Sequence, residues 1–352
     1  MTTAAPHTTC RPLPAADLDR VLESTRGLWD EARGRSLFIT GGTGFFGHWL
    51  LESFAHANEA LGLRARAVVL TRDPAAFARK APYLAARPGL EFVQGDVRDF
   101  AFPPGRFPLV IHAATAASAK LNDEAPLEMF DTIVAGTRRV VDFAAQGGVE
   151  KLLLTSSGAV YGRQPSDMTH VPEDHMGAPD PLLPASAYGE GKRAAEHLCA
   201  VHALRHGYEA KIARGFAFVG PHLPLDAHFA IGNFIRDALA GGPIRIAGDG
   251  SPFRSYLYAS DLAVWLWTIL LRGAAGRAYN VGSAHDIPIA QVAAQVSAAC
   301  GGPEVRVGRA GVPGQAPSRY VPDVGRAERE LGLRESVPLA EAVRRTAAWL
   351  AP

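Results

Sequence analysis

The sequence predicts an α/β protein built on a doubly wound parallel sheet, with a smaller mixed α/β part towards the C-terminus. The first observation is that short apolar segments alternate with helical patterns. The second is that these segments are apolar at almost every position, which is typical of parallel strands covered by helices on both faces. The third is a glycine cluster directly after the first segment. The predicted strands cover residues 37–39, 67–70, 90–93, 109–114 and 151–155.

The glycine cluster lies between the first predicted strand and a helical pattern of apolar residues. Gly41, Gly44 and Gly47 have the spacing G-x-x-G-x-x-G, a variant of the dinucleotide fingerprint G-x-G-x-x-G. Glycine lets backbone N–H groups approach an anion closely, and the start of a helix adds partial positive charge. We interpret the cluster as a cradle for a pyrophosphate, and an ordinary glycine-rich turn is the alternative.

Composition argues against several classes of partner. The chain has 352 residues, 47% of them apolar and 20% charged, with a net charge of +1, so we expect neither nucleic acid nor a membrane as a partner. Cys10, Cys199 and Cys300 are scattered and odd in number, which predicts a cytoplasmic protein without disulfides or a metal site. The start lacks the features of a signal peptide. The most apolar run, residues 262–271, is too short to cross a bilayer and is predicted to be a core helix.

The chain divides into three predicted parts, the last two of which are interleaved. A proline-rich loop over residues 165–184 is expected to cover a ligand site, since ligands of such sheets bind at the carboxyl ends of the strands. Long helices are predicted over about 123–146 and 186–206. The parts are a tail and extra helix (1–34), a dinucleotide-binding domain (35–220, with returning segments near 255–285) and a mainly substrate-binding part (221–352).

Tyr188 and Lys192 lie four residues apart in a predicted helix, which places them on one face. A phenol has an ordinary pKa near ~10, and an adjacent ammonium lowers that pKa by favouring the phenolate. Ser156 and Ser157 follow the last predicted strand, where a hydroxyl can hold a substrate oxygen against the tyrosine. The structural alternatives are a solvated lysine, a half-buried tyrosine and a serine that caps the next turn.

In their order along the chain, these segments resemble the extended short-chain dehydrogenase/reductase family, and within it the nucleotide-sugar epimerase/dehydratase group. The resemblance covers roughly residues 35–350 and implies a Rossmann-type domain, a nicotinamide cofactor and a Ser/Thr-Tyr-Lys catalytic set. The segments that carry it are Thr40–Gly47, Asp96-Val97, His112-Ala113-Ala114, Thr155–Gly162 and Tyr188-x-x-x-Lys192.

The resemblance also implies roles for individual residues. The catalytic hydroxyl, the general base or acid and its cationic partner are Ser157, Tyr188 and Lys192. The substrate-binding residues are Ser157, Asn233, Arg254 and Arg319, the two arginines being suited to bidentate recognition of a diphosphate. The cofactor-binding residues are Gly41, Gly44, Phe45, Phe46, Gly47, Arg72, Asp96, Val97, Ala113, Ala114, Thr155, Tyr188 and Lys192.

The chain departs from the family pattern just after Ser157. Sugar 4,6-dehydratases and decarboxylases usually carry carboxylates there, whereas this chain has Gly158 and Ala159. We therefore expect hydride and proton transfer at one carbon, in a 4-epimerase or a 4-keto-sugar reductase acting on a nucleoside-diphosphate hexose. Dehydration or decarboxylation is the alternative, because the proline-rich loop also offers acids and bases: His170, Glu173, Asp174 and His175.

Two asparagines common in the family are also replaced, by Ile133 and Ala217, which suggests an unusual substrate or pose. Cofactor choice depends on the end of the second strand, where an acidic residue binds the ribose of NAD and an arginine accommodates the phosphate of NADP. Thr71 stands at the acidic position and Arg72 follows, so NADP is favoured over NAD. An inward-turned Asp73 would restore NAD.

Two other functions remain as alternatives. One is reduction of a non-sugar carbonyl, which would leave Arg254 and Arg319 without a purpose. The other is a cofactor-sensing regulator, which is disfavoured because such proteins tend to lack the Tyr/Lys pair. The expected partner is a nucleoside-diphosphate sugar, and a homodimer is one option for the assembly.

Overall fold

The computed structural model describes residues 10–115, 119–227 and 229–351 and centres on one parallel sheet. Seven strands lie in the order β11-β6-β5-β4-β1-β2-β3, and every neighbouring pair is parallel. This is the doubly wound arrangement that the alternating pattern predicts. The strands are β1 (Ser36–Thr40), β2 (Arg66–Thr71), β3 (Leu90–Gln94), β4 (Leu109–His112), β5 (Lys151–Ser157), β6 (Glu209–Gly215) and β11 (Arg277–Val281).

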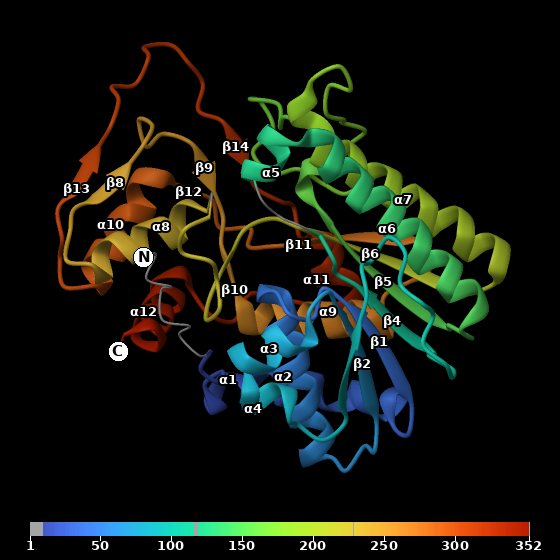
Figure 1. Ribbon diagram of the computed structural model, residues 1–352. Helices are drawn as coiled ribbons and strands as arrows, with labels where there is room; N and C mark the ends of the chain where they lie inside the picture. The colour runs from blue at the N-terminus through green and yellow to red at the C-terminus, as the bar shows by residue number, and fades with distance from the viewer. Residues whose placement is uncertain (1–9, 116–118, 228, 352) are drawn as a thin grey trace, which may run out of the picture.

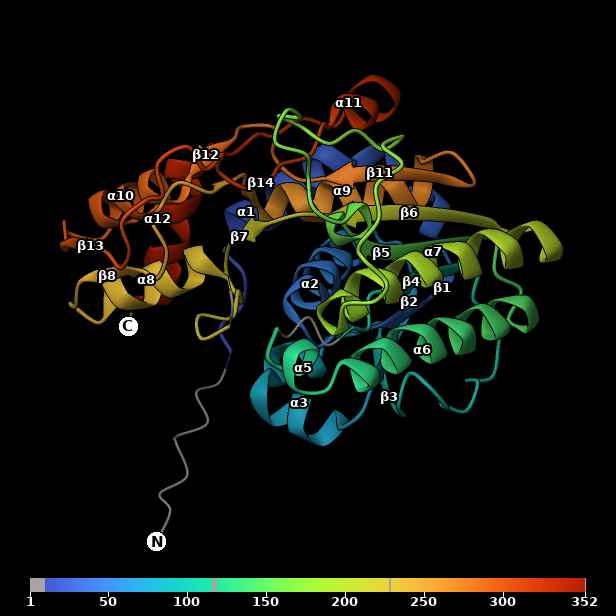
Figure 2. The ribbon, with the colours of Figure 1, turned by 90° about the horizontal axis from the view of Figure 1, so that it is seen from above.

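Helices cover both faces of the sheet (Figures 1 and 2). On one face, α6 and α7 pack against each other and against the central strands. On the other, α1, α2 and α9 pack together. Alternate side chains of β1 serve the two cores, because Leu37 and Ile39 join one buried cluster and Phe38 joins the other. These helices are α1 (Ala15–Thr25), α2 (Phe45–Ala60), α6 (Pro126–Gln146), α7 (Ala187–His206) and α9 (Ala259–Arg272).

A second group of elements lies at the left of Figure 1, away from α6 and α7. It contains a three-stranded sheet in the order β12-β9-β14 and two strand pairs, β10-β7 and β13-β8. Its strands are β7 (Phe218–Val219), β8 (Ile244–Ile246), β9 (Phe253–Arg254), β10 (Leu257–Tyr258), β12 (Ile287–Pro288), β13 (Val305–Val307) and β14 (Arg319–Tyr320). Its helices are α8 (Ala230–Leu239), α10 (Ile289–Ala299) and α12 (Leu339–Leu350).

The remaining elements are short. The helices α3 (Pro74–Lys80) and α4 (Pro82–Ala85) lie near the β3 edge, and α11 (Gly325–Leu331) packs beside β11. The 3-10 turns are η1 (Arg26–Ala32), η2 (Gly158–Tyr161) and η3 (Pro184–Ser186).

The structure alters two predicted elements. The helix predicted over about 123–146 is α6, which begins at Pro126, where the missing N–H costs no hydrogen bond, and a separate short helix, α5 (Ala119–Glu124), precedes it. The fourth strand ends at His112, before the small residues predicted to continue it. The apolar run 262–271 lies inside α9 and is almost wholly buried. In the described parts of the chain, no helix is long and apolar enough to cross a membrane.

Candidate functional site

The glycine loop joins β1 to α2 at the carboxyl edge of the sheet. A Cβ at Gly41 would lie 2.4 Å from the backbone of Ala113, and one at Gly47 would lie 2.2 Å from the carbonyl of Gly42. Close backbone packing therefore requires both of these glycines. Gly44 differs, because a Cβ there would meet only the Gly41 oxygen, at 3.7 Å. Gly44 caps α2 in an extended conformation without a side-chain cap, so the helix start is open to an anion, and the loop fits the pyrophosphate of a dinucleotide.

Buried hydrogen bonds fix the position of this loop. The Thr40 hydroxyl lies 2.7 Å from His112 Nδ1 and accepts from the N–H of Ala114 at 3.2 Å. His112 Nε2 lies 3.1 Å from the Thr137 hydroxyl. Burial lowers the pKa of His112 to about 3, so the imidazole is neutral and one ring nitrogen acts as an acceptor. Sequence reasoning did not predict this network, because its members come from three separate elements.

Ser157, Tyr188 and Lys192 come together at the ends of β5 and α7. The Ser157 hydroxyl accepts from the N–H of Ala159 at 3.2 Å, as the turn-capping alternative predicts. Lys192 Nζ donates to the Thr155 carbonyl at 2.8 Å and to the Thr115 hydroxyl at 2.7 Å. It lies 5.8 Å from the centroid of the Tyr188 ring. The helical spacing therefore places the two side chains on one face, as predicted.

The pKa of Tyr188 differs from the sequence expectation. Burial raises the pKa of this phenol, and only the neighbouring Ser157 hydroxyl opposes that effect. Burial also lowers the pKa of Lys192 to about 8. Burial therefore outweighs the lowering that the sequence predicts for Tyr188, and the Lys192 ammonium is held by Thr155 and Thr115.

Tyr320, from β14, is a further residue of this site that sequence reasoning missed. Its hydroxyl lies 3.3 Å from the Ser157 hydroxyl. A Cβ at Gly158 would lie 2.7 Å from the Phe216 ring and 2.8 Å from the Tyr320 hydroxyl. The two aromatic rings therefore fill the space that a side chain at position 158 would need. The only sequence signal for this contact is Gly158 itself, because Tyr320, which occupies the space beside it, lies 162 residues further along the chain.

Several predicted cofactor residues lie around the ends of β2 and β3. Arg72 is exposed, whereas Asp73 caps α3 by accepting from the N–H of Ala76 at 2.8 Å. Asp96 accepts two hydrogen bonds from the Arg98 guanidinium, at 2.8 and 2.9 Å. These bonds hold the pKa of Asp96 below its usual value. Val97 is buried against the Gly136 backbone.

The predicted substrate residues differ in how many of their polar groups already bind other residues of the protein. Arg319 pairs with Asp286 at 2.5 Å and lies over the Phe253 ring. Asn233 accepts from Arg236 at 3.2 Å. Arg254, opposite Tyr320 in the β9-β14 pair, donates only to the carbonyl of Phe253 at 2.7 Å and has no carboxylate partner among the described residues.

Two side chains of the proline-rich loop are also held by contacts with other parts of the protein. Glu173 accepts from the N–H of Asn280 at 3.0 Å and lies 3.8 Å from Arg326. His170 Nε2 lies 2.8 Å from the carbonyl oxygen of Ala284. These contacts attach the loop to the strand β11 and the turn after it. Both side chains therefore stabilise the loop.

The parallel sheet, the open glycine loop and the grouped Ser157, Tyr188 and Lys192 are those of a nicotinamide-dependent enzyme of the extended short-chain dehydrogenase/reductase class. The chain belongs to the NAD dependent epimerase/dehydratase family, whose model matches residues 37–282.

Individual relatives carry several activities. UDP-glucuronic acid decarboxylase 6 from Arabidopsis thaliana is 28% identical over 312 residues, which are 87% of each chain. A dTDP-glucose 4,6-dehydratase from Streptomyces griseus is 27% identical and aligns with 89% of this chain and 93% of its own. Among solved structures, the dTDP-glucose 4,6-dehydratase DesIV from Streptomyces venezuelae, with NAD and TYD bound, is 26% identical at a TM-score of 0.76, covering 89% of this chain and 96% of its own.

Proposed function

We propose that this enzyme acts at C4 of the hexose of a nucleoside-diphosphate sugar, as a 4-epimerase or a 4-keto-sugar reductase. The observation that carries the proposal is the packing around Gly158, where Phe216 and Tyr320 fill the space next to Ser157. Sugar 4,6-dehydratases and decarboxylases usually carry carboxylates just after the catalytic hydroxyl, whereas here the space next to the backbone of position 158 is taken by aromatic side chains. Chemistry at a single carbon needs only one proton donor or acceptor, which Tyr188 supplies.

The chain's own residues position the sugar and move one proton. A bound nicotinamide supplies the hydride chemistry. Tyr188 exchanges a proton with the sugar 4-oxygen, and Ser157 donates a hydrogen bond that holds this oxygen in place. Lys192, held by the Thr155 carbonyl, lies beside the phenol, where its positive charge favours the phenolate against the opposing effect of burial.

Arg254 supports a diphosphate-bearing substrate. Its guanidinium has no carboxylate partner among the described residues, and its planar set of donors suits bidentate recognition of a phosphate. It lies opposite Tyr320 in the strand pair β9-β14. Burial raises the pKa of Tyr320, and the charge of Arg254 only partly opposes this effect. A diphosphate bound there would accept hydrogen bonds from the remaining N–H groups of Arg254 and place an attached sugar near Ser157.

We also propose NADP as the preferred cofactor. Arg72 is exposed at the end of β2, and the carboxylate of Asp73, the nearest acidic candidate for a ribose contact, is used to cap α3. The related DesIV structure holds NAD, so affinity is the direct test. Titration of the purified chain with each nucleotide should give tighter binding of NADP. Tighter binding of NAD would contradict the preference.

Dehydration or decarboxylation is a second candidate, and the names of the relatives favour it. In this case the Tyr320 hydroxyl, 3.3 Å from Ser157, would take the place of the missing carboxylate as a proton carrier.

Product analysis separates the two candidates. The purified chain is incubated with UDP- and dTDP-linked glucose, galactose and glucuronate, and separately with a dTDP-linked 4-keto-6-deoxyhexose as the substrate for reduction. Each incubation is run with and without added NADPH, and the products are identified by mass spectrometry and NMR. An epimer of unchanged mass, or a reduced sugar formed only with NADPH, supports C4 chemistry. Loss of water or of carbon dioxide would overturn it. The nucleotide released on denaturation adds a second readout, because retained NAD favours an epimerase and an empty site favours a reductase.

A further inference from the structure

Three metal-ligating side chains meet beneath the start of α2, outside the site described above. Cys10 belongs to the segment before α1, His48 to the first turn of α2 and His222 to the loop after β7. Their sulfur and ring nitrogen ligand atoms all lie within 4.8 Å of one another. Because the three residues are far apart in the sequence, spacing rules for metal motifs do not detect them.

Three of the four ring nitrogens of the two histidines are buried without a hydrogen-bond partner among the described residues. His48 is 2% exposed, and neither of its ring nitrogens has a partner among the described residues. The Nε2 atom of His222 is buried and unpartnered in the same sense. Their rings stack with centroids 3.9 Å apart. Buried polar atoms normally find a partner because leaving one unpaired is costly, so a ligand that binds these nitrogens is indicated.

The backbone holds all three residues in place. The N–H of Cys10 donates to the Lys80 carbonyl at 2.7 Å. His222 adopts the left-handed conformation, with φ of 67°, which is uncommon for a residue with a side chain and occurs at functional sites. This conformation turns the imidazole towards His48.

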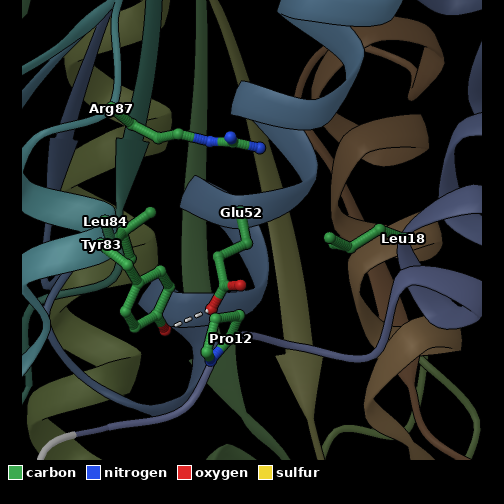
Figure 3. A pocket seen from close by; sticks show the side chains of 6 residues that line it. All are labelled: Pro12, Leu18, Glu52, Tyr83, Leu84 and Arg87. Atoms are coloured by element: carbon green, nitrogen blue, oxygen red, sulfur yellow. Dashed lines mark hydrogen bonds between the residues drawn. The ribbon is translucent and has the colours of Figure 1, made fainter.

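A carboxylate lies next to the two imidazoles. Glu52 Oε1 is 3.8 Å from His48 Nδ1 and 3.6 Å from His222 Nε2, both beyond hydrogen-bond length. The carboxylate is fixed by the N–H of Leu13 and the hydroxyl of Tyr83, each at 2.8 Å. Figure 3 shows Glu52 and Tyr83 among the side chains that line a hollow of about 200 Å³.

We propose that Cys10, His48 and His222 bind one zinc ion, with Glu52 as the fourth ligand. A thiolate, two imidazoles and a carboxylate are the ligand types that zinc takes in tetrahedral sites. Zinc–nitrogen and zinc–sulfur bonds of about 2.0–2.3 Å require the ligand atoms to move closer and the stacked rings to turn apart. Binding releases the thiol proton of Cys10. The ion would fasten the N-terminal segment to the helix that carries the glycine loop.

Metal content and cobalt spectroscopy test the proposal on the full chain without a histidine tag. After dialysis against chelator and titration with zinc chloride, we expect one zinc per chain and a higher unfolding temperature. Titration with cobalt chloride should give a thiolate-to-cobalt absorption band, which requires Cys10. The proposal would be overturned if the natural chain bound zinc no more tightly than the Cys10→Ser variant does. Cobalt spectra of the natural chain without a thiolate band would also overturn it.

Matched variants assign the ligands. Cys10→Ser and His222→Gln should each weaken zinc binding by about 10-fold or more, and Cys10→Ser should abolish the cobalt band. Cys300→Ser and His56→Gln, which change a cysteine and a histidine outside the cluster, should bind zinc as the natural chain does. Should Cys10→Ser fail to fold, the cobalt band of the natural chain and the affinity of His222→Gln decide the question. Equal affinity in the His222→Gln variant would contradict the assignment.

Discussion

At the scale of single residues, the reactive groups of the site are set by burial. Desolvation raises the pKa of Tyr188 and lowers that of Lys192, so in the free enzyme both groups are shifted towards their neutral forms. A positive charge brought by the cofactor and the exclusion of water would act on a phenol that is already positioned. A variant that tests Tyr188 should therefore remove its hydroxyl and keep its aromatic ring.

Tyr188→Phe should lower kcat by about 10²–10⁴-fold, because it removes the proposed general acid or base and leaves the ring packing unchanged. Cofactor affinity, measured by titration, should stay close to that of the natural enzyme, since Lys192 keeps its bonds to Thr155 and Thr115. Turnover near the natural rate in this variant would remove Tyr188 from the mechanism.

Lys192 should leave a signature in the pH dependence of stability. Its pKa is 10.5 ordinarily and about 8 in the fold, so the unfolded chain binds more protons between these values. This lysine therefore makes the free energy of unfolding rise with pH through that window. Between about pH 8 and 10 the natural chain should gain about 2 kcal/mol more than Lys192→Met. Urea unfolding at both pH values measures the difference, and parallel pH dependences would contradict the buried ammonium.

At the scale of elements, the small sheet β12-β9-β14 brings Tyr320 and the predicted substrate residue Arg254 to the edge of the large one. β14 presents Tyr320 to Ser157, and β9 places Arg254 opposite Tyr320. The same sheet engages Arg319 with Asp286. The two arginines that the sequence treats as a pair therefore differ, because only Arg254 lacks a carboxylate partner in the described parts of the chain.

Arg254→Ala should weaken the binding of UDP or dTDP by about 10- to 150-fold, which corresponds to the ~1.5–3 kcal/mol of a charge-assisted hydrogen bond. Calorimetric titration gives the affinities. Arg306→Ala, which removes an exposed arginine of β13 already paired with Glu304, serves as the control and should bind normally. Unchanged affinity in Arg254→Ala would favour a carbonyl substrate without a diphosphate.

Elements defined by local patterns were predictable from the sequence, and contacts between distant segments were not. The strand ends and the glycine loop follow from short apolar runs and from glycine spacing, so the parallel sheet was predicted correctly. Pro126 at the start of α6 is also a local signal. Tyr320 beside Ser157, Asp286 beside Arg319 and the cluster around His48 depend on chain crossings that no local spacing records.

At the scale of the whole molecule, the N-terminal segment is part of the core although the family match begins at residue 37. Asp17, 1% exposed, accepts from the Tyr258 hydroxyl at 2.6 Å and from Arg345 at 2.8 Å. Trp349 donates to the carbonyl of Pro12 at 2.9 Å. These bonds tie the segment to β10 and α12, in the smaller group of elements, while α1 packs against α9, next to the large sheet.

Trp29 provides the clearest test of this role. It is 1% exposed, its ring lies 4.8 Å from that of Trp267, and its indole N–H donates to the Thr25 hydroxyl at 2.9 Å. Trp29→Ala should lower the free energy of unfolding by about 3–5 kcal/mol, because it leaves a cavity against α9. Leu127→Ala, at a side chain that is 79% exposed, should change it by less than about 0.5 kcal/mol. Urea unfolding measures both, and a loss as small as that of the control would show that the segment before β1 only covers a core that is stable without it.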